Sequence, residues 1–577
     1  MALAVFLLFI ASACTKSVDE PESKDDVVIV SILGTNDVHG ELLPQPGRGG
    51  LTTLSGYVDA LRALRAADNG GMLLIDAGDM WQGTLESNSS EGESVMDAFN
   101  ALGYTAAAIG NHEFDFGPAG PLPIPAGDAD DPQGALKLRA AEAEFPLLAA
   151  NLIDISTNQP VAWENVQPSA MVEVAGIKVG IIGVMAADAL RATIAANVVG
   201  LRVAPLTESI IREAQALREN GADLVIVTAH AGSRCNEFDD PLDLSSCDLA
   251  GEIMQVASEL PKGLVDHIIA GHVHAGIAHI VNGISITSSF SNTRAFGRVD
   301  FTIDRATRTT QSRRVYPPQP ICRYVDTESG QCAARDDESE SVVEATYEDQ
   351  QIVPGKAILA IAESAAQRVS EIKAEELGPY LETPITLDGN PESALGNLMT
   401  EALLEMYDAD IAMHNVSGGI RANLPAGNLT FGSVFQMFPF DNRVVILNIS
   451  GADLRRIIAN QVHNNGRRAG FSGMRVFVDC VNDQMSIAML LADGREIQDE
   501  ENVRVLANDF LALGGDDLLT PAMPDDGFQY STELPLVRDS LTQWFRMQDN
   551  KLRAEQFLNE ENRRWNLPDP LPADCSL

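Results

Sequence analysis

The sequence has few basic residues. Its 577 residues include 40 Lys and Arg against 82 Asp and Glu, so the formal net charge is −42. A surface of this charge repels nucleic acids and anionic membranes, which excludes both as expected partners. It also repels phosphorylated small molecules at long range, so a nucleotide site would need local cations, either metal ions or arginines. The simpler reason for the acidic surface is solubility.

Cysteine is also scarce, and no pair has the CxxC spacing of a common zinc site. Seven cysteines are present. Apart from Cys14 their number is even, which in an exported protein favours disulfides. Spacing suggests the pairs Cys235–Cys247 and Cys322–Cys332, which would close short loops, and Cys480–Cys575 would then be the third pair. Because six cysteines allow many connectivities, the sequence alone leaves the pairing open.

The chain lacks an apolar run long enough to span a bilayer. The N-terminal run, MALAVFLLFIASAC, fits the hydrophobic region of a signal peptide, although no Lys or Arg precedes it. The stretch from Ala11 to Cys14 resembles a lipobox, which predicts lipidation of Cys14; an ordinary signal with an incidental cysteine is the alternative. We therefore expect an exported protein: a periplasmic or outer-membrane lipoprotein of a bacterium, or a secreted protein. Cys14 would be its only attachment to a membrane.

The length favours two domains, and no internal repeat is visible. Hydrophobic residues make up 45% of the chain, enough for two packed cores. An acidic run and a helical stretch separate the halves. The predicted division is a signal peptide and tether at 1–26, a first domain at 27–335, a helical linker at 336–378 and a second domain at 379–577.

Apolar runs alternate with helical stretches throughout the first half, and most of these runs end in Asp, Asn or His. The runs are 27–37, 71–79, 106–115, 178–185, 222–230 and 266–274. This pattern is typical of an α/β fold with buried strands. Ligands of such sheets bind beyond the carboxyl ends of the strands, so we expect these polar residues to converge at one edge.

The polar residues at these strand ends have the composition of a dinuclear metal site. They are Asp37, His39, Asp79, Asn111, His112, Asp115, His230, His272 and His274. Two divalent cations about 3.5–4 Å apart need a shared anionic ligand and flanking nitrogen and oxygen ligands. Such ions polarise a phosphoryl group and lower the pKa of water, which predicts phosphoester hydrolysis. His267 and His279 are better explained as satisfied or exposed histidines.

These blocks resemble the calcineurin-like metallophosphoesterase pattern D-x-H, G-D, G-N-H-[DE], H and G-H-x-H, and all five occur in order. The resemblance implies a four-layer αββα sandwich. It also implies two divalent ions, such as Zn, Mn or Co, with the ligands Asp37, His39 and His274 for the first ion, Asn111, His230 and His272 for the second, and Asp79 bridging both. In that family the residue corresponding to His112 is no ligand. It faces the substrate as general acid or transition-state stabiliser and is oriented by Asp115.

The second half resembles the bacterial 5'-nucleotidase and UDP-sugar hydrolase family, and the resemblance covers essentially all of the mature chain. Its markers are SGGIRANLPAGNLTFGSVFQMFPFDN (417–442) and NDFLALGGDD (508–517). It implies a smaller α/β substrate-binding domain that rotates between open and closed states. The substrate residues it implies are Arg421 for phosphate or ribose oxygens, Phe440 and Phe510 for the base, Asn442 in the PFDN stretch, Asp516 for the ribose hydroxyls, and Gly515 for close backbone approach.

Two positions depart from that family. Pro391 lies about where the family has an arginine for the phosphate, and Val416 replaces an asparagine that here comes one residue earlier, as Asn415. Both changes affect phosphate recognition rather than the metal ligands. Arg443 could substitute for the missing cation, although a surface position is the simpler expectation.

The sequence therefore favours a metal-dependent phosphomonoesterase that acts on nucleotides outside the cytoplasm, releases nucleoside and phosphate for uptake, and is a monomer or weak dimer. UDP-sugar hydrolysis and 2',3'-cyclic nucleotide phosphodiesterase/3'-nucleotidase activity are the enzymatic alternatives. A thiosulfohydrolase shares the fold, but no motif supports that activity. A nucleotide-binding surface lipoprotein without catalysis is the alternative from another class, and the full set of ligands argues against it.

Overall fold

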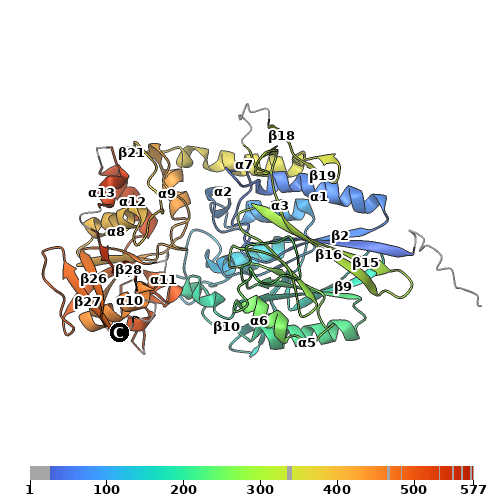
Figure 1. The fold of residues 1–577 in the computed structure, drawn as a ribbon, viewed down its shortest axis with the longest axis horizontal. Helices are drawn as coiled ribbons and strands as arrows, with labels where there is room; N and C mark the ends of the chain where they lie inside the picture. The colour runs from blue at the N-terminus through green and yellow to red at the C-terminus, as the bar shows by residue number, and fades with distance from the viewer. Residues whose placement is uncertain are drawn as a thin grey trace, which may run out of the picture.

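The computed structural model describes residues 26–333, 341–463, 468–481, 484–524, 526–531, 533–548, 551–559, 563–571 and 575. The predicted signal peptide, the lipobox and Cys14 lie outside the described residues. Figure 1 shows two bodies side by side, the N-terminal one built on two large sheets and the C-terminal one smaller.

The first domain contains two mixed sheets that pack face to face. In sheet order, one consists of β16 (Thr310–Pro320), β15 (Ala295–Asp304), β1 (Val27–Thr35), β2 (Gly71–Asp76), β3 (Ala106–Ala108), β4 (Leu147–Leu148) and β7 (Val166–Gln167). The other consists of β13 (Gly276–Val281), β14 (Ile284–Ser289), β12 (His267–Ala270), β11 (Leu224–His230), β9 (Ile177–Met185) and β8 (Ser169–Val174).

Helices cover the outer faces of both sheets. In Figure 1, α1 (Gly50–Ala67) and α3 (Glu93–Leu102) lie above the strands, and α5 (Leu206–Glu219) and α6 (Glu252–Glu259) lie below them. The resulting order of layers is α, β, β, α. The predicted four-layer sandwich is therefore confirmed.

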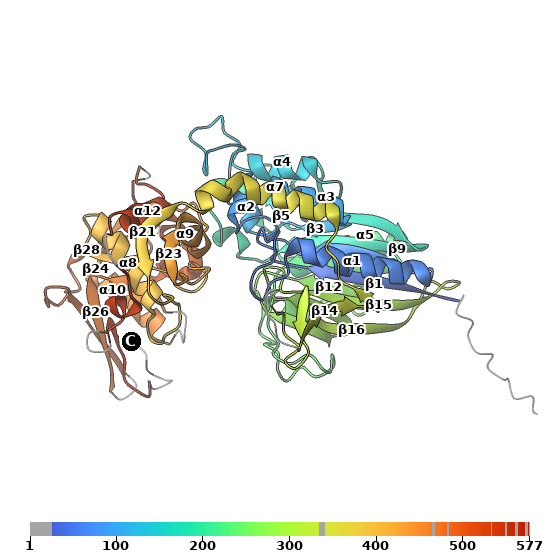
Figure 2. The same ribbon diagram turned by 90° about the horizontal axis from the view of Figure 1, so that it is seen from above.

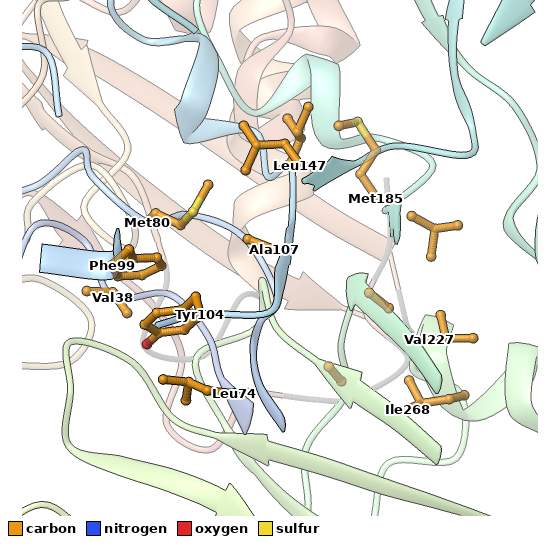
Figure 3. Close-up of a cluster of buried hydrophobic side chains, with 14 of the residues drawn as sticks. Val38, Leu74, Met80, Phe99, Tyr104, Ala107, Leu147, Met185, Val227 and Ile268 are labelled. Atoms are coloured by element: carbon orange, nitrogen blue, oxygen red, sulfur yellow. The ribbon is translucent and has the colours of Figure 1, made fainter. Parts of the chain in front are cut away.

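Two hydrophobic clusters hold these layers together. Between the sheets, Ile32 and Ile75 of the first pack with Ile181 and Ile226 of the second, all fully buried. The second cluster lies under the helices and extends to the strand ends (Figure 3). Removing this apolar surface from water is the main stabilising contribution to the domain.

Most strand–helix alternation predicted for the first half is present, but the edges of the sheets differ from the expectation. β15 runs antiparallel to β1, and β13 and β8 run antiparallel to β14 and β9. The central pairs β1–β2, β2–β3, β9–β11 and β11–β12 are parallel. Parallel neighbours place their carboxyl ends at one edge, so the polar strand ends of both sheets meet facing the second domain.

The second domain is also α/β. Its main sheet has the order β24 (Val444–Ser450), β28 (Asn502–Asn508), β22 (Ile411–His414) and β25 (Gly470–Ser472). A second sheet has the order β27 (Gln484–Leu491), β26 (Met474–Val481) and β29 (Trp565–Asn566), and β21 (Glu376–Leu381) pairs with β23 (Gly427–Thr430). The helices packed on these sheets include α8 (Ala394–Met406), α9 (Phe431–Met437), α10 (Gly451–Val462) and α12 (Val537–Arg546).

A single long helix, α7 (Lys356–Lys373), runs along the first domain and ends beside α9 of the second (Figure 2). Val369 of α7 packs with Leu85 and Phe435, which come from the two domains. Lys373 Nζ pairs with Glu86 Oε1 at 2.5 Å. The junction thus combines an apolar contact with an ion pair. No helix of the described residues is long and apolar enough to cross a membrane.

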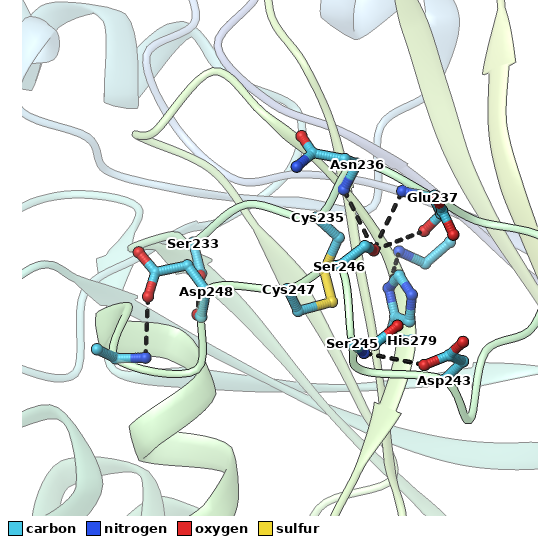
Figure 4. Close-up of a disulfide and its surroundings, with 12 residues drawn as sticks. Ser233, Cys235, Asn236, Glu237, Asp243, Ser245, Ser246, Cys247, Asp248 and His279 are labelled. Carbon is cyan, nitrogen blue, oxygen red and sulfur yellow. Dashed lines mark hydrogen bonds between the residues drawn. A yellow bond between two sulfur atoms is a disulfide. The ribbon is translucent and has the colours of Figure 1, made fainter. Parts of the chain in front are cut away.

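Three disulfides join the pairs expected from the sequence: Cys235–Cys247, Cys322–Cys332 and Cys480–Cys575. The first fixes a loop whose start and end are also joined by a hydrogen bond from Ser233 Oγ to the Asp248 carbonyl, 2.6 Å (Figure 4). His279 lies buried beside this disulfide, where its Nδ1 accepts the Ala278 amide at 3.2 Å. As expected, it is a structural histidine.

His267, at the start of β12, predicts a pH-dependent stability. It is buried, its Nδ1 lies 2.9 Å from the Ser285 carbonyl, and burial lowers its pKa from 6.5 to about 3. As the pH falls below 6.5, this histidine therefore binds a proton in the unfolded chain, whereas in the folded chain it binds one only near pH 3. The contribution of this group to the free energy of unfolding is complete above pH 6.5 and decreases as the pH falls. At pH 5 the decrease is about 2 kcal/mol.

We expect His267→Gln to reduce the difference between the unfolding free energies at pH 7 and pH 5 by about 2 kcal/mol in urea titrations. The exposed His463, changed to Gln, is the matched control. An unchanged difference in the His267 variant would contradict the assignment.

Candidate metal centre and active site

The loops after the strands hold the predicted metal ligands in a strained backbone conformation. Five of the seven have positive φ angles: Asp37 (49°), His39 (50°), Asp79 (58°), His272 (71°) and His274 (57°). Non-glycine residues seldom adopt this region, and each such residue costs on the order of 1 kcal/mol or more. Strain in five of seven ligands of one predicted site indicates that function, rather than local preference, fixes their backbone.

Asp37, His39 and His274 form the first cluster. The Nε2 atom of His274 lies 3.3 Å from Asp37 Oδ1 and 3.0 Å from His39 Nε2. Between two ring nitrogens at that distance at most one proton fits, so lone pairs converge on one point. Such a point suits a cation.

Asp79, His230 and His272 form the second cluster, with Asn111 beside it. His230 Nε2 lies 3.2 Å from Asp79 Oδ2, 2.9 Å from Asn111 Oδ1 and 3.2 Å from His272 Nδ1. Asp79 Oδ2 is also 3.9 Å from His39 Nε2 of the first cluster. Asp79 therefore lies between the clusters, where a bridging ligand is needed.

The outer nitrogens of two of these histidines are engaged by the backbone. His39 Nδ1 lies 2.9 Å from the Gln82 carbonyl, and His230 Nδ1 lies 2.9 Å from the Ala77 carbonyl. A carbonyl can only accept, so each Nδ1 carries a proton and each Nε2 faces its cluster, where it can bind either a proton or a metal ion. Histidine ligands of metals are oriented in this way.

The charges of the site favour a cation as well. Burial opposes the charged form of His230, but the carboxylates of Asp79 and Asp37 raise its pKa to about 10. Burial likewise opposes the charge of Asp37, whose pKa His274 nevertheless lowers to about 2. The buried carboxylates thus stabilise positive charge at these points, so the residues fit divalent ions.

Glu113, the acidic residue of the G-N-H-[DE] block, has a structural role. Its buried carboxylate accepts three backbone amides: Asp79 N at 2.9 Å, Met80 N at 2.7 Å and Gly110 N at 2.6 Å. It thereby ties the loop of Asp79 to the loop of Asn111. A Cβ on Gly110 would lie 2.3 Å from Asp79 Oδ1, so this approach also requires glycine. The sequence signal for this role is that Glu113 is the acidic residue of the G-N-H-E block and is not among the predicted metal ligands.

His112 and Asp115 are paired, and the second domain reaches them. His112 Nδ1 lies 2.7 Å from Asp115 Oδ2, and its Nε2 lies 3.2 Å from Arg421 Nη2. Burial and Arg421 lower the pKa of His112, but Asp115 and Asp79 outweigh them and raise it. The ring centroid of His112 is 5.5 Å from that of His39. The dyad therefore adjoins the first metal cluster without belonging to it.

A cavity of about 770 Å³ lies between the domains and joins these groups. Its lining includes most of the predicted site residues: Asp79, Asn111, His112, Asp115, His272, His274, Arg421, Phe440, Asn442, Phe510 and Asp516. Asp37, His39, His230 and Gly515 do not line it; the first three are buried metal-cluster residues next to it, whereas Gly515 lies under Phe510.

The predicted base-binding residues approach this cavity from the second domain. The ring of Phe440 lies 5.1 Å from the Arg421 guanidinium carbon and 5.7 Å from the ring of His112. A Cβ on Gly515 would lie 2.4 Å from the ring of Phe510, so only glycine lets that ring take its place. Asn442 donates to Asp509 Oδ1 at 3.2 Å, which fixes the start of the short helix α11 (Asp509–Ala512) that carries Phe510.

The positions that depart from the related family lie as follows. Asn415 lines the cavity and donates to Asp516 Oδ2 at 2.5 Å, whereas Val416 packs towards Gly396 and Gly470. Neither Pro391 nor Arg443 lines this cavity. Arg443 Nη1 instead donates to the Leu534 carbonyl at 3.3 Å. Arg421 is therefore the cation of the second domain closest to the dyad.

Comparison with known proteins gives the same two parts. Residues 30–276 match the model of the calcineurin-like phosphoesterase family, and residues 372–523 match the model of the 5'-nucleotidase C-terminal domain. A cell wall protein of Listeria monocytogenes is 27% identical over 85% of this chain and 64% of its own length. Protein UshA of Yersinia enterocolitica is 25% identical, with 85% of this chain and 87% of the relative covered.

Among solved structures, a 5'-nucleotidase precursor from Thermus thermophilus has a TM-score of 0.68 at 22% identity. That match covers 92% of this chain and all of the other, and it shows the shared fold. The two family models and the strand-end clusters together identify a phosphoric monoester hydrolase. The chain therefore consists of a calcineurin-like phosphoesterase domain followed by a 5'-nucleotidase C-terminal domain.

Proposed function

We propose that the protein uses two divalent metal ions to hydrolyse nucleoside 5'-monophosphates to nucleoside and phosphate. The observation that carries this proposal is the meeting of the domains in one cavity. Arg421 of the second domain lies 3.2 Å from His112 of the first, next to both ligand clusters. A substrate held by the second domain would thus present its phosphate to the clusters.

The two ions, held by the ligands predicted above with Asp79 between them, would supply Lewis acidity to the phosphoryl group and lower the pKa of water. The chain's own groups do the rest. Arg421 binds a phosphoryl oxygen, because its guanidinium is a fixed cationic donor. His112 donates from Nε2 to the oxygen on which charge develops, and Asp115 keeps the ring oriented and protonated.

We also propose that Phe440 and Phe510 stack on the base, with Asp516 and Asn415 near the ribose hydroxyls. Because stacking is worth about 1–3 kcal/mol per base, Phe510→Ala should raise KM for AMP roughly 10- to 100-fold with kcat little changed. Steady-state kinetics check this. KM for phenyl phosphate, which has no base, should stay the same.

Phe477→Ala on β26, an exposed phenylalanine outside the cavity, is the matched control. If Phe510→Ala raised KM equally for AMP and phenyl phosphate, the ring would serve packing rather than base recognition.

We propose that the protein acts outside the cytoplasm, where it would release nucleoside and phosphate for uptake. Three disulfides support an oxidising compartment, and one relative is named a cell wall protein. The N-terminal run is consistent with export, and lipidation of Cys14 remains a prediction. Mass spectrometry of the protein from membrane and soluble fractions tests the lipid.

A substrate panel tests the activity. Phosphate release from AMP, UDP-glucose and cyclic 2',3'-AMP is measured with Mn²⁺, Co²⁺ or Zn²⁺ and again with chelator. We expect AMP to be the best substrate and chelator to abolish turnover. Preference for the cyclic ester or for UDP-glucose would replace this proposal with that activity. Binding of AMP without turnover in every metal would favour the non-catalytic lipoprotein.

A further inference from the structure

Residues 192–197 lie beside the cavity and bind the segment that contains His112, residues 111–115. Three hydrogen bonds join them to residues 111–115. They are the bonds from Asn111 Nδ2 to the Ala192 carbonyl (2.8 Å), from Thr193 Oγ1 to Asp115 Oδ1 (2.7 Å) and from Asn197 Nδ2 to the Phe114 carbonyl (2.8 Å). Ala192 and Thr193 also line the cavity. One short segment therefore contacts a predicted metal ligand, the carboxylate of the dyad and the wall of the substrate site.

Thr193 makes the contact with the most direct chemical consequence. The two oxygens of Asp115 are divided: Oδ2 faces His112 Nδ1, and Oδ1 accepts the hydroxyl of Thr193. All three residues are at least nine-tenths buried, with exposed fractions of 9% for His112, 8% for Asp115 and 4% for Thr193. Loss of the hydroxyl would leave a buried carboxylate oxygen with one partner fewer, which costs free energy.

The carboxylate needs this second contact because its terminal torsion is broad. An Asp side chain can rotate about χ2 at little cost, so a single hydrogen bond to an imidazole fixes neither partner. Thr193 is β-branched, so its χ1 is restricted and its hydroxyl holds Asp115 Oδ1 in one position. The other oxygen, Oδ2, then points in a single direction, towards His112. The ring of His112 then presents Nε2 at one place.

We propose that Thr193 is a positioning residue of the hydrolysis, whose hydroxyl orients Asp115 so that Asp115 holds His112 towards the substrate. This inference rests on the proposed roles of His112 and Asp115. It is independent of the preferred nucleotide, since the contacts lie in the first domain, away from the base. Thr193 thus extends the dyad to a chain of three side chains.

The test compares Thr193→Val, which keeps the shape and removes the hydroxyl, with Thr193→Ser, which keeps the hydroxyl. Groups that orient a functional side chain through hydrogen bonds typically contribute about 10- to 100-fold. We expect Thr193→Val to lower kcat by roughly that factor for both AMP and phenyl phosphate, with KM and bound metal little changed. Thr193→Ser should stay within about threefold of the parent protein.

A double-mutant cycle separates this role from a merely structural one. In a His112→Asn background, Thr193→Val should lower kcat no further, because the ring that it positions is gone. Thr542→Val is the matched control: its hydroxyl is equally buried and donates to the Arg538 carbonyl at 2.8 Å in α12. We expect that control to keep its kcat.

Three results would overturn the inference: an unchanged kcat in Thr193→Val, an equal loss in the His112→Asn background, or a loss that Thr193→Ser does not restore. If Thr193→Val does not fold, Thr193→Ala takes its place in the same double-mutant cycle, and the same results would overturn the inference. Turnover of phenyl phosphate without turnover of AMP would refute the nucleotide proposal and leave the Thr193 test intact.

Discussion

Replacing Asp79 with Asn is expected to lower kcat/KM for AMP by at least about a thousandfold, a loss of about 4 kcal/mol of transition-state stabilisation. Its Oδ2 lies 3.2 Å from His230 in one cluster and 3.9 Å from His39 in the other, so one carboxylate serves both predicted ions. An amide carries no charge and cannot balance two cations. Phosphate release and metal content after dialysis check the result.

Asp76, three residues earlier, offers a matched control. It is also fully buried, accepts Thr35 Oγ1 at 2.6 Å and belongs to neither metal cluster. Burial raises the pKa of Asp76 well above its ordinary value, so Asp76→Asn keeps the shape and removes a charge that burial already disfavours. We expect less than about a tenfold loss in this control. A similar loss in both variants would mean that Asp79 acts through the fold.

The positions of the metal ligands could be predicted from sequence because they follow a local rule. Each lies at the end of a buried strand or within a few residues of it, and parallel strands bring their carboxyl ends to one edge. Asp79 beyond β2 and His230 at the end of β11 are far apart along the chain yet 3.2 Å apart in space. The antiparallel pairing of β15 with β1 carries no such signal, since it depends on a contact between segments far apart along the chain.

The residues that sequence reasoning missed act through tertiary contacts. Glu113 binds three amides from two loops, and Thr193 reaches Asp115 from a segment far along the chain. An isolated Glu or Thr has no periodicity that would reveal such a partner. The approach of Arg421 to His112 depends in addition on how the domains pack through α7, which no local pattern encodes.

Changing His112 to Asn should lower kcat for AMP by roughly 10²- to 10⁴-fold, the usual contribution of a positioned proton donor, and should leave both metal clusters intact. The ring of His112 contacts Asp115 and Arg421. Its hydrogen bond to the predicted ligand Asp79 comes from the backbone amide and not from the ring, at 2.9 Å. The substitution keeps that amide. Metal content should therefore match the parent protein while turnover falls, and loss of a metal ion would show that His112 is a ligand.

The pH profile separates proton donation from simple packing. The pKa of His112 is raised, because Asp115 and Asp79 outweigh the effects of burial and Arg421. The donor therefore keeps its proton to a higher pH than a free imidazole does, and kcat of the parent protein should decrease on the alkaline side, at a pH above 6.5. In His112→Asn this alkaline decrease should disappear. The loss should also be smaller for p-nitrophenyl phosphate, whose leaving group departs without a proton, than for AMP.

His267→Gln provides the comparison for both measurements, since it removes a buried histidine outside the cavity and both clusters. Its kcat and its alkaline decrease should equal those of the parent protein. If His112→Asn lost equal factors for AMP and p-nitrophenyl phosphate, His112 would stabilise charge on the phosphoryl group instead of protonating the leaving oxygen. The neighbouring Arg421 guanidinium would then share that work, and Arg421→Lys in the His112→Asn background should cost less than Arg421→Lys alone.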